Sequence, residues 1–426
     1  MSDRSDAGSF AYHEAPGALA QWHRAPRAGL LRTAEIGADG ARVVIAVEWL
    51  GADGTPVHPV RWGRYVASLA AAPVALWVRL DRPPFLEPWR APATGAELRA
   101  AMLAQGIDPG PLLAPLWCHL RGERRPLVVV GFPIPDHVGG PDTYVHWQAV
   151  RLPAMPKEHS RTRRVRASRD AIRAFGSRTL HWIPMSENWH PDVLQNRGQL
   201  PAPLRAARVV VAGGGALGGP VAEHLVRMGV PNVSVVDPDR LEAGNLVRHP
   251  LTLNDLHGSK AKALAKGLNA CSPTANVRGF DVALPSFRSD VRQALSEADL
   301  LLDLTASDVL LRAVPDLGLR GDARVVSASL GLHAERLYLY ADDASAYSPD
   351  AFDVWFGPYR AAEHAAAAHL GLPQAAGCWN PVTPVPLNRI SVFAGLLVED
   401  LPSLFTDRGR TLEARDWPGR QRTMRR

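Results

Sequence analysis

The residues with the clearest chemical potential surround a glycine-rich loop in the second half of the chain. Gly213, Gly215 and Gly218 follow the β-branched run RVVVA (208–212) and precede an apolar segment with helical spacing. In this order, the first glycine permits a tight turn, the second lets a phosphate approach the backbone, and the third allows close packing of helix on strand. The motif predicts a nucleotide-binding βαβ unit. Alone, it fits a dinucleotide dehydrogenase as well as an ATP-using enzyme.

The polar residues that follow the loop favour ATP. Asp237 ends the next predicted strand, where a carboxylate can bind ribose hydroxyls, and Asp239, Asn245, Arg248 and Lys260 come after it. A nicotinamide dinucleotide needs little positive charge beyond the glycine loop, whereas a triphosphate that releases pyrophosphate needs cations and Mg²⁺. Arg248 and Lys260 supply cations, and Asn245 supplies a neutral donor.

Another buried strand, DLLLDL (299–304), ends near Asp303. The carboxyl ends of the strands in a doubly wound parallel sheet meet at one crevice. Asp303 is therefore predicted to hold a metal ion beside the phosphates.

The ordered combination of GxGxxG, DxD, NLxR, a lysine and a strand-end aspartate resembles the ubiquitin-activating enzyme family. That family includes bacterial ThiF-like adenylyltransferases of molybdopterin and thiamine biosynthesis. The resemblance implies ATP and Mg²⁺ as cofactors and adenylation of the C-terminal glycine of a ubiquitin-like protein. It implies that Asp237 binds ribose, that Asn245, Arg248 and Lys260 hold phosphates, and that Asp303 binds Mg²⁺. Arg248 and Lys260 thereby become candidate catalytic residues.

Arg197 lies just before the first strand of this unit and resembles an arginine that family members send across a dimer interface to ATP. The resemblance therefore also implies a homodimer. The implied cofactor-binding set is Gly213, Gly215, Gly218, Asp237, Asp239, Asn245, Arg248, Lys260 and Arg197.

The sequence departs from the biosynthetic members because their zinc-binding cysteine pairs are missing, which favours protein conjugation over sulfur transfer. The stretch GFPIPDHVGGPDTYVHWQAVRLP (131–153) resembles activating-enzyme-like proteins encoded in bacterial ubiquitin-like operons. This second resemblance implies a conjugating enzyme as partner and an antiviral conjugation pathway. Within it, the N-terminal domain is expected to be a degenerate adenylation domain or a docking module.

A thioester-forming enzyme needs a nucleophilic cysteine near the adenylate. Cys378 is the candidate, because it lies in the loop AAGCWNPVTPVPLN ahead of a predicted helix, where prolines forbid regular helix. A buried cysteine beside Trp379 is the alternative interpretation. Cys271 is interpreted as a packing residue, and Cys118 as a buried one.

Three other functions share parts of this pattern. An NAD(P)-dependent oxidoreductase would use Gly213 to Asp237 but leaves Asn245, Arg248 and Lys260 unexplained. A non-catalytic scaffold would not need the intact set. An adenylyltransferase without a thioester step would not need Cys378.

These residues require an α/β fold with a Rossmann-like doubly wound adenylation domain over residues 201–407. A smaller mixed α/β domain is predicted over 20–155, with strands at 41–49, 71–80, 127–132 and 144–152 and a helix at 96–105. A basic, proline-rich linker (156–200) separates the two, and a basic tail without apolar period (408–426) is expected to be frayed. His249 is interpreted as a surface residue, and Asp342–Asp343 as a turn.

Composition restricts the broad class of the protein. Hydrophobic residues make up 46% of the 426 residues, enough for packed cores, and the formal net charge is +6. Three scattered cysteines fit neither a disulfide framework nor a four-cysteine zinc site, and a cytoplasmic protein is expected. Aromatic residues do not interleave with the arginines of 161–178 before Phe175, so no nucleic-acid partner is predicted. No apolar run is long enough to span a bilayer, so no membrane association is expected.

Overall fold

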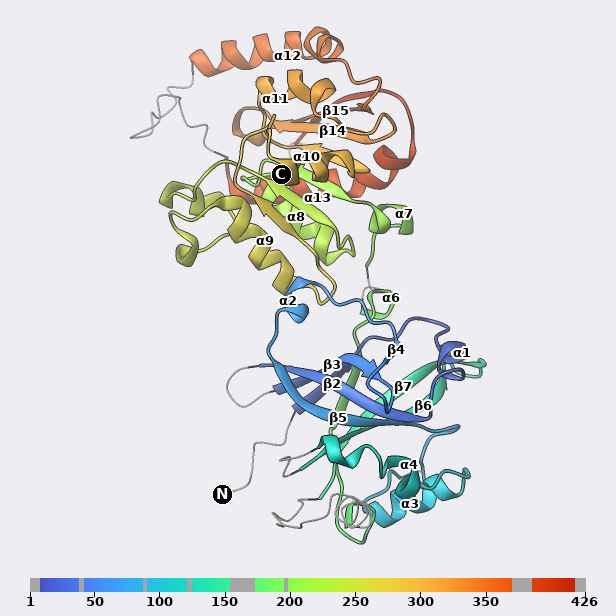
Figure 1. Cartoon of the computed structure of the whole chain (residues 1–426). Helices are drawn as coiled ribbons and strands as arrows, with labels where there is room; N and C mark the ends of the chain where they lie inside the picture. Colours follow the sequence, from blue (N-terminus) through green and yellow to red (C-terminus); the bar gives the residue numbers. More distant parts are fainter. Residues whose placement is uncertain are drawn as a thin grey trace, which may run out of the picture. The chain divides into compact units, whose positions relative to one another are not determined.

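The computed structural model describes residues 8–37, 42–86, 90–120, 125–153, 173–194, 198–369 and 385–417. The chain divides into two compact units, Met1–Arg197 and Gly198–Arg426 (Figure 1). Arg197 and Cys378 lie outside the described residues.

Among its described residues, the C-terminal unit forms a seven-stranded sheet in the order β12–β11–β10–β13–β14–β15–β16. Strands β12 to β14 pair in parallel, whereas β15 and β16 add to the edge in antiparallel fashion. The strands are β10 (Val209–Ala212), β11 (Val233–Val236), β12 (Arg278–Phe280), β13 (Leu300–Asp303), β14 (Arg324–Leu330), β15 (Arg336–Asp343) and β16 (Thr411–Asp416).

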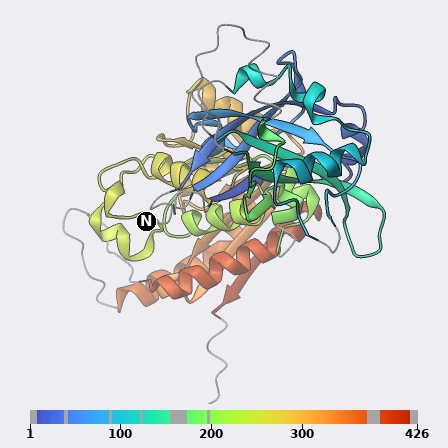
Figure 2. The ribbon, with the colours of Figure 1, turned by 90° about the horizontal axis from the view of Figure 1, so that it is seen from below.

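Helices cover both faces of this sheet because its central strands are apolar on both sides. Val209 and Val211 pack under α8 (Gly218–Arg227), α9 (Lys260–Cys271) and α13 (Leu387–Thr406). Val210 and Ala212 pack toward α10 (Ser289–Ser296), α11 (Asp308–Ala313) and the start of α12 (Pro349–Ala368). Figure 2 shows α13 running beside α8. The short α7 (Ala202–Ala206) precedes β10.

The strand order has a switch point at β10, because β11 lies on one side of β10 and β13 on the other. The chain therefore leaves β10 and β13 toward opposite edges, which opens a crevice at their carboxyl ends. The predicted Rossmann-like doubly wound fold is confirmed for the C-terminal unit.

Within the described ranges, the N-terminal unit forms a nine-stranded mixed sheet in the order β8–β7–β6–β5–β2–β3–β1–β9, with β4 paired to β3. Its strands are β1 (Gly8–Tyr12), β2 (Ala28–Ile36), β3 (Arg42–Leu50), β4 (Pro56–His58), β5 (Ala71–Arg79), β6 (Leu127–Pro135), β7 (Asp142–Arg151), β8 (His181–Trp182) and β9 (Met185–Asn188). Its helices include α1 (Leu19–Trp22), α2 (Arg64–Ala67), α3 (Gly95–Leu103), α4 (Pro109–Leu113) and α6 (Pro191–Leu194).

The four strands predicted in this unit correspond to β3, β5, β6 and β7, and the predicted helix corresponds to α3. The sheet reaches beyond residues 20–155 at both ends, because β1 pairs in parallel with β9. Strands β8 and β9 thus lie within the stretch that the sequence suggested as a linker.

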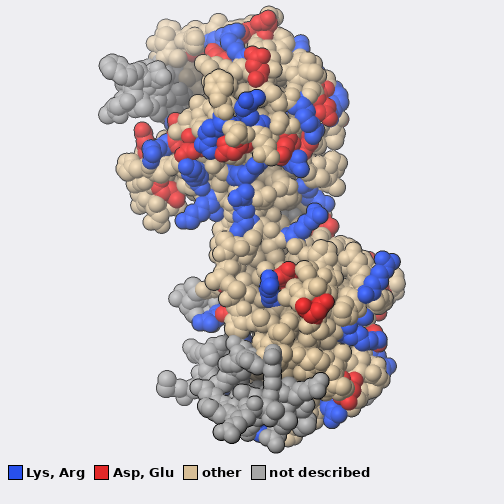
Figure 3. Space-filling view, viewed as in Figure 1, with Lys and Arg blue, Asp and Glu red and all other residues tan. Residues whose placement is uncertain are grey.

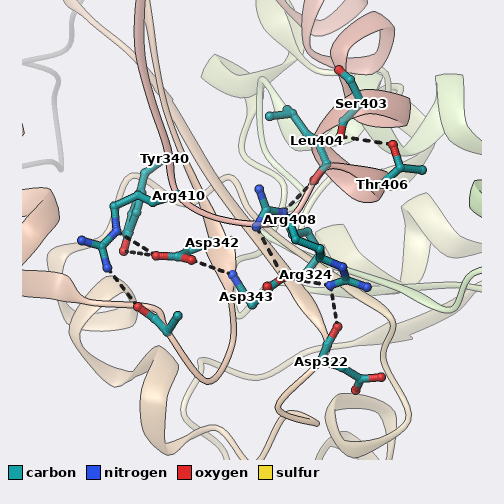
Figure 4. Close-up of polar contacts among 11 residues, drawn as sticks. Asp322, Arg324, Tyr340, Asp342, Asp343, Ser403, Leu404, Thr406, Arg408 and Arg410 are labelled. Carbon is teal, nitrogen blue, oxygen red and sulfur yellow. Dashed lines mark hydrogen bonds and ion pairs between the residues drawn. The ribbon is translucent and has the colours of Figure 1, made fainter.

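The last strand, β16, lies in the stretch that was expected to be frayed, and ion pairs explain its order (Figure 4). Arg410 Nε lies 2.8 Å from Oδ2 of Asp342, whose side chain is buried at the end of β15. Arg408 Nη1 lies 2.8 Å from Asp343 Oδ1. The expected turn at Asp342–Asp343 was therefore wrong, because both residues belong to β15 and anchor the segment that leads into β16.

Arg324 ties the same corner to α13. Its side chain is buried at the start of β14, its Nε donates to the Leu404 carbonyl at 2.6 Å, and its Nη1 lies 3.4 Å from Asp343. We call Arg324, Asp342, Asp343, Arg408 and Arg410 the β16 clamp.

Lys and Arg side chains are interspersed with Asp and Glu on the face of the C-terminal unit seen in Figure 3. Many of them pair, as Arg288 does with Asp281 and Asp290. Among the residues that the structure describes, no helix is long and apolar enough to cross a membrane.

Candidate active site

The glycine-rich loop joins β10 to α8 at the switch point. Gly213 has φ +88°, a left-handed conformation that favours glycine. A Cβ on Gly218 would lie 1.7 Å from the Gly213 carbonyl oxygen, so only glycine lets the start of α8 approach the loop this closely. A Cβ on Gly215 would meet nothing within 4 Å, and Gly215 lines a cavity. The left-handed conformation of Gly213 and the close approach at Gly218 are backbone reasons for glycine at these two positions.

Asp237 follows β11, and its carboxylate contacts the backbone of the glycine loop. Its Oδ2 accepts the Gly214 N–H at 2.7 Å, and its Oδ1 accepts the Asp239 N–H at 2.8 Å. Burial raises the pKa of this carboxyl, although these backbone donors oppose the shift. Each oxygen keeps a lone pair, so the carboxylate can still accept a ribose hydroxyl.

Two cations line the cavity. Lys260 begins α9, is 8% exposed, and its Nζ lies 2.9 Å from Asp239 Oδ2. Arg248 ends the 3-10 segment η3 (Ala243–Arg248) and is half-buried. Arg248 has no ion-pair partner among the described residues, and a guanidinium in that situation suits a bound phosphate.

The cavity has a volume of about 520 Å³ and lies at the carboxyl ends of β10, β11 and β13. Its lining brings together Gly213, Gly215, Asp237, Asp239, Arg248 and Lys260 from the predicted set. A volume of this size is in the range of small-molecule sites.

Asn245 does not contribute to this lining. Its Oδ1 accepts the Glu242 N–H at 3.1 Å and helps to close the first turn of η3. Its predicted role on the phosphates therefore stays a prediction.

Asp303 ends β13 and is 3% exposed. Its Oδ1 accepts from the Thr305 hydroxyl at 2.7 Å, and its Oδ2 accepts from the Ser327 hydroxyl at 3.3 Å. Burial raises the pKa of this carboxyl, and the described residues provide it with no cationic partner. A buried carboxylate with hydroxyl neighbours fits Mg²⁺, which is typically held by one or two carboxylates together with substrate phosphates and waters.

Sequence reasoning missed Ser327, since no motif marks it. Ser327 lies in β14 directly opposite Asp303 of β13. This position could identify Ser327, but it can be inferred only once the order of the strands in the sheet is known.

His249 was also misread as a surface residue. Its imidazole is buried, and its Nε2 lies 2.6 Å from the Gly214 carbonyl oxygen.

A second cavity of about 430 Å³ adjoins the first. Both are lined by Ala306, Ser307, Ala328, Ser329, Leu330 and Val385. The second also contains Asp303 and the apolar side chains of Leu311, Leu332, Phe352 and Phe356. Asp303 thus lines the second cavity, and the two residues that follow it, Leu304 and Thr305, line the first.

The two described cysteines are half-buried and free. Cys271 ends α9, and Cys118 Sγ lies 3.3 Å from the Pro115 carbonyl oxygen.

Two family models match the chain. Residues 1–189 match the Cap2 central linker domain, and residues 192–329 match the ThiF family. The second match covers β10 to β14 with the glycine loop, both cations and Asp303. It confirms the resemblance to ThiF-like adenylyltransferases.

Two curated relatives resemble different lengths of the chain. An ATP-dependent ubiquitin transferase-like protein Cap2 of Enterobacter hormaechei is 27% identical over 380 residues, which cover 86% of this chain and 62% of that protein. A sulfur carrier protein adenylyltransferase of Thermus thermophilus is 42% identical over 106 residues, 25% of this chain and 38% of that protein. The chain therefore matches less than two thirds of the length of either relative.

Among solved structures, E. coli MccB with AMPCPP and selenomethionine MccA is 15% identical, with a TM-score of 0.35. The match covers 62% of this chain and 73% of that one.

Proposed function

From a ThiF family domain over residues 192–329, we propose that this protein is an ATP-dependent adenylyltransferase that activates the C-terminal carboxylate of a ubiquitin-like protein. The observation that carries this proposal is one cavity that combines a glycine loop, a buried Lys260 and an Arg248 without an ion-pair partner in the described part of the chain, with Asp303 at the adjoining cavity. An NAD(P)-dependent oxidoreductase would not explain Arg248 and Lys260 together in this cavity.

Each group has a distinct part in binding ATP. Asp237 accepts the ribose hydroxyls, while the loop backbone and the start of α8 face the phosphates. Arg248 and Lys260 neutralise the charge of the leaving pyrophosphate. Asp303 would hold Mg²⁺, which when bound shields the phosphate oxygens from the incoming carboxylate.

In the reaction, a carboxylate oxygen of the substrate attacks the α-phosphorus. The new P–O bond forms as the bond between the α-phosphorus and the bridging oxygen breaks, and pyrophosphate leaves with the electron pair. No proton transfer is needed, so positioning and charge stabilisation provide the catalysis. The C-terminal segment of the substrate would reach the α-phosphate through the second cavity, because that cavity adjoins the first at Ser307 and Ser329.

The later steps extend this proposal. The acyl-adenylate passes to a thioester at Cys378 and then to a conjugating enzyme, in a bacterial ubiquitin-like conjugation pathway with an antiviral role. Arg197 reaches ATP in the partner subunit of a homodimer. The likeness of the chain to the Cap2 relative and to the Cap2 linker model supports conjugation over cofactor biosynthesis.

ATP–pyrophosphate exchange tests the central claim. The full chain is assayed with and without each ubiquitin-like protein encoded beside its gene. We expect exchange that depends on one of these proteins and falls by roughly a hundredfold or more in Lys260→Ala, since a charge that acts on the leaving pyrophosphate is lost. Lys262→Ala is the matched control, because Lys262 lies on the same helix and pairs with Asp281 at the surface.

Asp303→Asn should likewise abolish exchange without unfolding the chain. A folded protein that supports no exchange with any candidate would reject the proposal. Hydride transfer with a nicotinamide cofactor would then favour an oxidoreductase, and failure to bind ATP would favour a scaffold.

A further inference from the structure

His249 contacts the glycine loop but does not line the cavity. It is 8% exposed, its Nε2 lies 2.6 Å from the Gly214 carbonyl oxygen, and its Nδ1 lies 3.2 Å from the Leu251 nitrogen. A carbonyl oxygen only accepts, so Nε2 must carry the hydrogen, and a backbone N–H only donates, so Nδ1 must be bare. The two contacts therefore fix one neutral tautomer. Burial, which lowers the pKa of His249, favours the same neutral form.

The contact also sets the direction of the next N–H group. In a trans peptide, the carbonyl and the following N–H point in opposite directions. The Gly214 carbonyl faces His249, so the Gly215 N–H points away from it. Gly215 lines the nucleotide cavity, whereas His249 does not. The Gly214 N–H is meanwhile held by Asp237, so the peptides on both sides of Gly214 are fixed.

The same side chain anchors the segment that carries Arg248. Pro250 follows His249 and packs on the start of α8, where a Cβ on Gly219 would lie 3.0 Å from the Pro250 ring. Because His249 contacts the glycine loop and Pro250 contacts α8, the backbone from which the Arg248 side chain reaches the cavity is held in place relative to the glycine loop.

We propose that His249 is a positioning residue for phosphate binding, which directs the Gly215 N–H into the cavity and holds Arg248 beside it. This inference rests on the proposed function and adds to it a residue that touches neither substrate nor cofactor. Its effect is confined to phosphates, because the groups that it orients face them. Binding of the nucleoside moiety should not depend on it.

The test compares ATP with adenosine by isothermal titration calorimetry on the full chain. The variants His249→Gln and His249→Met are similar in length, but only glutamine provides an N–H donor. We expect His249→Met to weaken Mg-ATP binding roughly tenfold and His249→Gln to stay within a factor of about three of wild type. Adenosine affinity should be unchanged in both. His224→Met, on the later part of α8, is the control and should bind ATP as wild type does.

Equal weakening of ATP and adenosine, or ATP binding by His249→Met at wild-type strength, would overturn the role. So would a folded His249→Gln that is as weak as His249→Met. If the methionine variant does not fold, ¹⁵N-histidine NMR of the wild type decides, since an Nδ1–H tautomer at His249 is incompatible with the contacts. Wild-type protein that binds no ATP would count against the proposed function itself.

Discussion

Glu14 is a buried carboxyl group within the tryptophan-rich core of the N-terminal unit. Trp22 and Trp147 donate their indole N–H groups to its Oε2 at 2.7 Å and 3.1 Å, and His58 Nε2 lies 3.3 Å from its Oε1. Burial raises the pKa of Glu14 to about 8 and lowers that of His58 to about 4. At neutral pH the two groups are therefore an uncharged acid and an uncharged imidazole, and their contact is not an ion pair.

This shift predicts how the stability of the fold varies with pH. The folded pKa of Glu14 lies above its ordinary value of 4.5, so between these values the folded state binds more protons than the unfolded state. The contribution of protonated Glu14 to the stability of the fold is therefore fully present below its ordinary pKa of 4.5 and is lost as pH rises through about 8. His58 acts in the opposite direction, but only below its ordinary pKa of 6.5.

Between pH 6.5 and 8, Glu14 should therefore dominate this local pair. We expect the melting temperature, followed by tryptophan fluorescence, to fall across this window in the wild type. Glu14→Gln should show a flatter profile because its amide does not titrate. The same slope in both proteins would mean that Glu14 is already ionised in the folded state.

The sequence motifs predicted the structural surroundings of some site residues but not of others. The glycine motif predicts Gly213 and Gly218 because turn geometry and helix approach are backbone requirements that admit few other residues. Asp237 follows from its place at a strand end. His249 could not be predicted, because nothing local shows that η3 folds back beneath the loop.

At the scale of elements, the start of α8 offers a matched pair of glycine variants. Gly218→Ala would place a methyl group 1.7 Å from the Gly213 carbonyl oxygen, so the helix must move. We expect a loss of roughly 1–3 kcal/mol of stability, the usual size of an overpacking effect, together with weaker ATP binding.

Gly215→Ala introduces the same methyl group into open space. Its fold should stay within about 0.5 kcal/mol of the wild type, while its KM for ATP rises because the methyl group projects where phosphate approaches. Urea denaturation and exchange kinetics separate the two effects. Equal destabilisation by both alanines would contradict the assigned roles.

The β16 clamp gives a second prediction for an element. Arg410→Met removes the cation that pairs with the buried Asp342 carboxylate. In the double variant Arg410→Met/Asp342→Asn, the carboxylate charge is removed as well, so no unpaired charge remains at this position. We expect the single variant to lose roughly 1–3 kcal/mol, less than for a fully buried pair because Arg410 is partly exposed. The double variant should recover part of this loss in a double-mutant cycle by urea denaturation. Additive losses would show that the pair is not coupled.

Strands could be predicted from the sequence where consecutive residues are apolar and buried. Strands β5 and β6 are apolar runs, and their sequence alone indicates strand. Strands β9 (MSEN) and β16 (TLEARD) are largely polar and half-exposed, and partners far along the chain hold them. Their order depends on pairing and ion pairs, which no local pattern contains.

At the scale of the whole molecule, the chain combines a segment that matches the ThiF family model with a segment that matches the Cap2 linker model. The sequence predicted the adenylation fold because its chemistry requires a fixed order of motifs along one sheet. It did not predict the architecture of the N-terminal unit. That sheet joins β1 to β9 across most of the unit, and no catalytic motif constrains it.

The proposed thioester step belongs to the scale of the whole chain, because it would link the adenylate, Cys378 and a conjugating enzyme. In this step the Cys378 thiolate attacks the acyl carbon, a C–S bond forms, the bond to the phosphate oxygen breaks, and AMP leaves with the electron pair. Cys378→Ala should therefore keep ATP–pyrophosphate exchange. It should also lose the thiol-sensitive adduct with the ubiquitin-like protein, resolved on gels with and without reductant.

The matched controls Cys118→Ala and Cys271→Ala should keep both activities, since these cysteines lie in η2 (Trp117–His119) and at the end of α9. An adduct that persists in Cys378→Ala but disappears in either control would move the nucleophile to that cysteine. Conjugation that survives all three substitutions would mean that the acyl-adenylate is attacked directly by its acceptor. The protein would then be an adenylyltransferase without a thioester step, and the two adjoining cavities, one with Arg248 and Lys260 and the other with Asp303, would account for all of its chemistry.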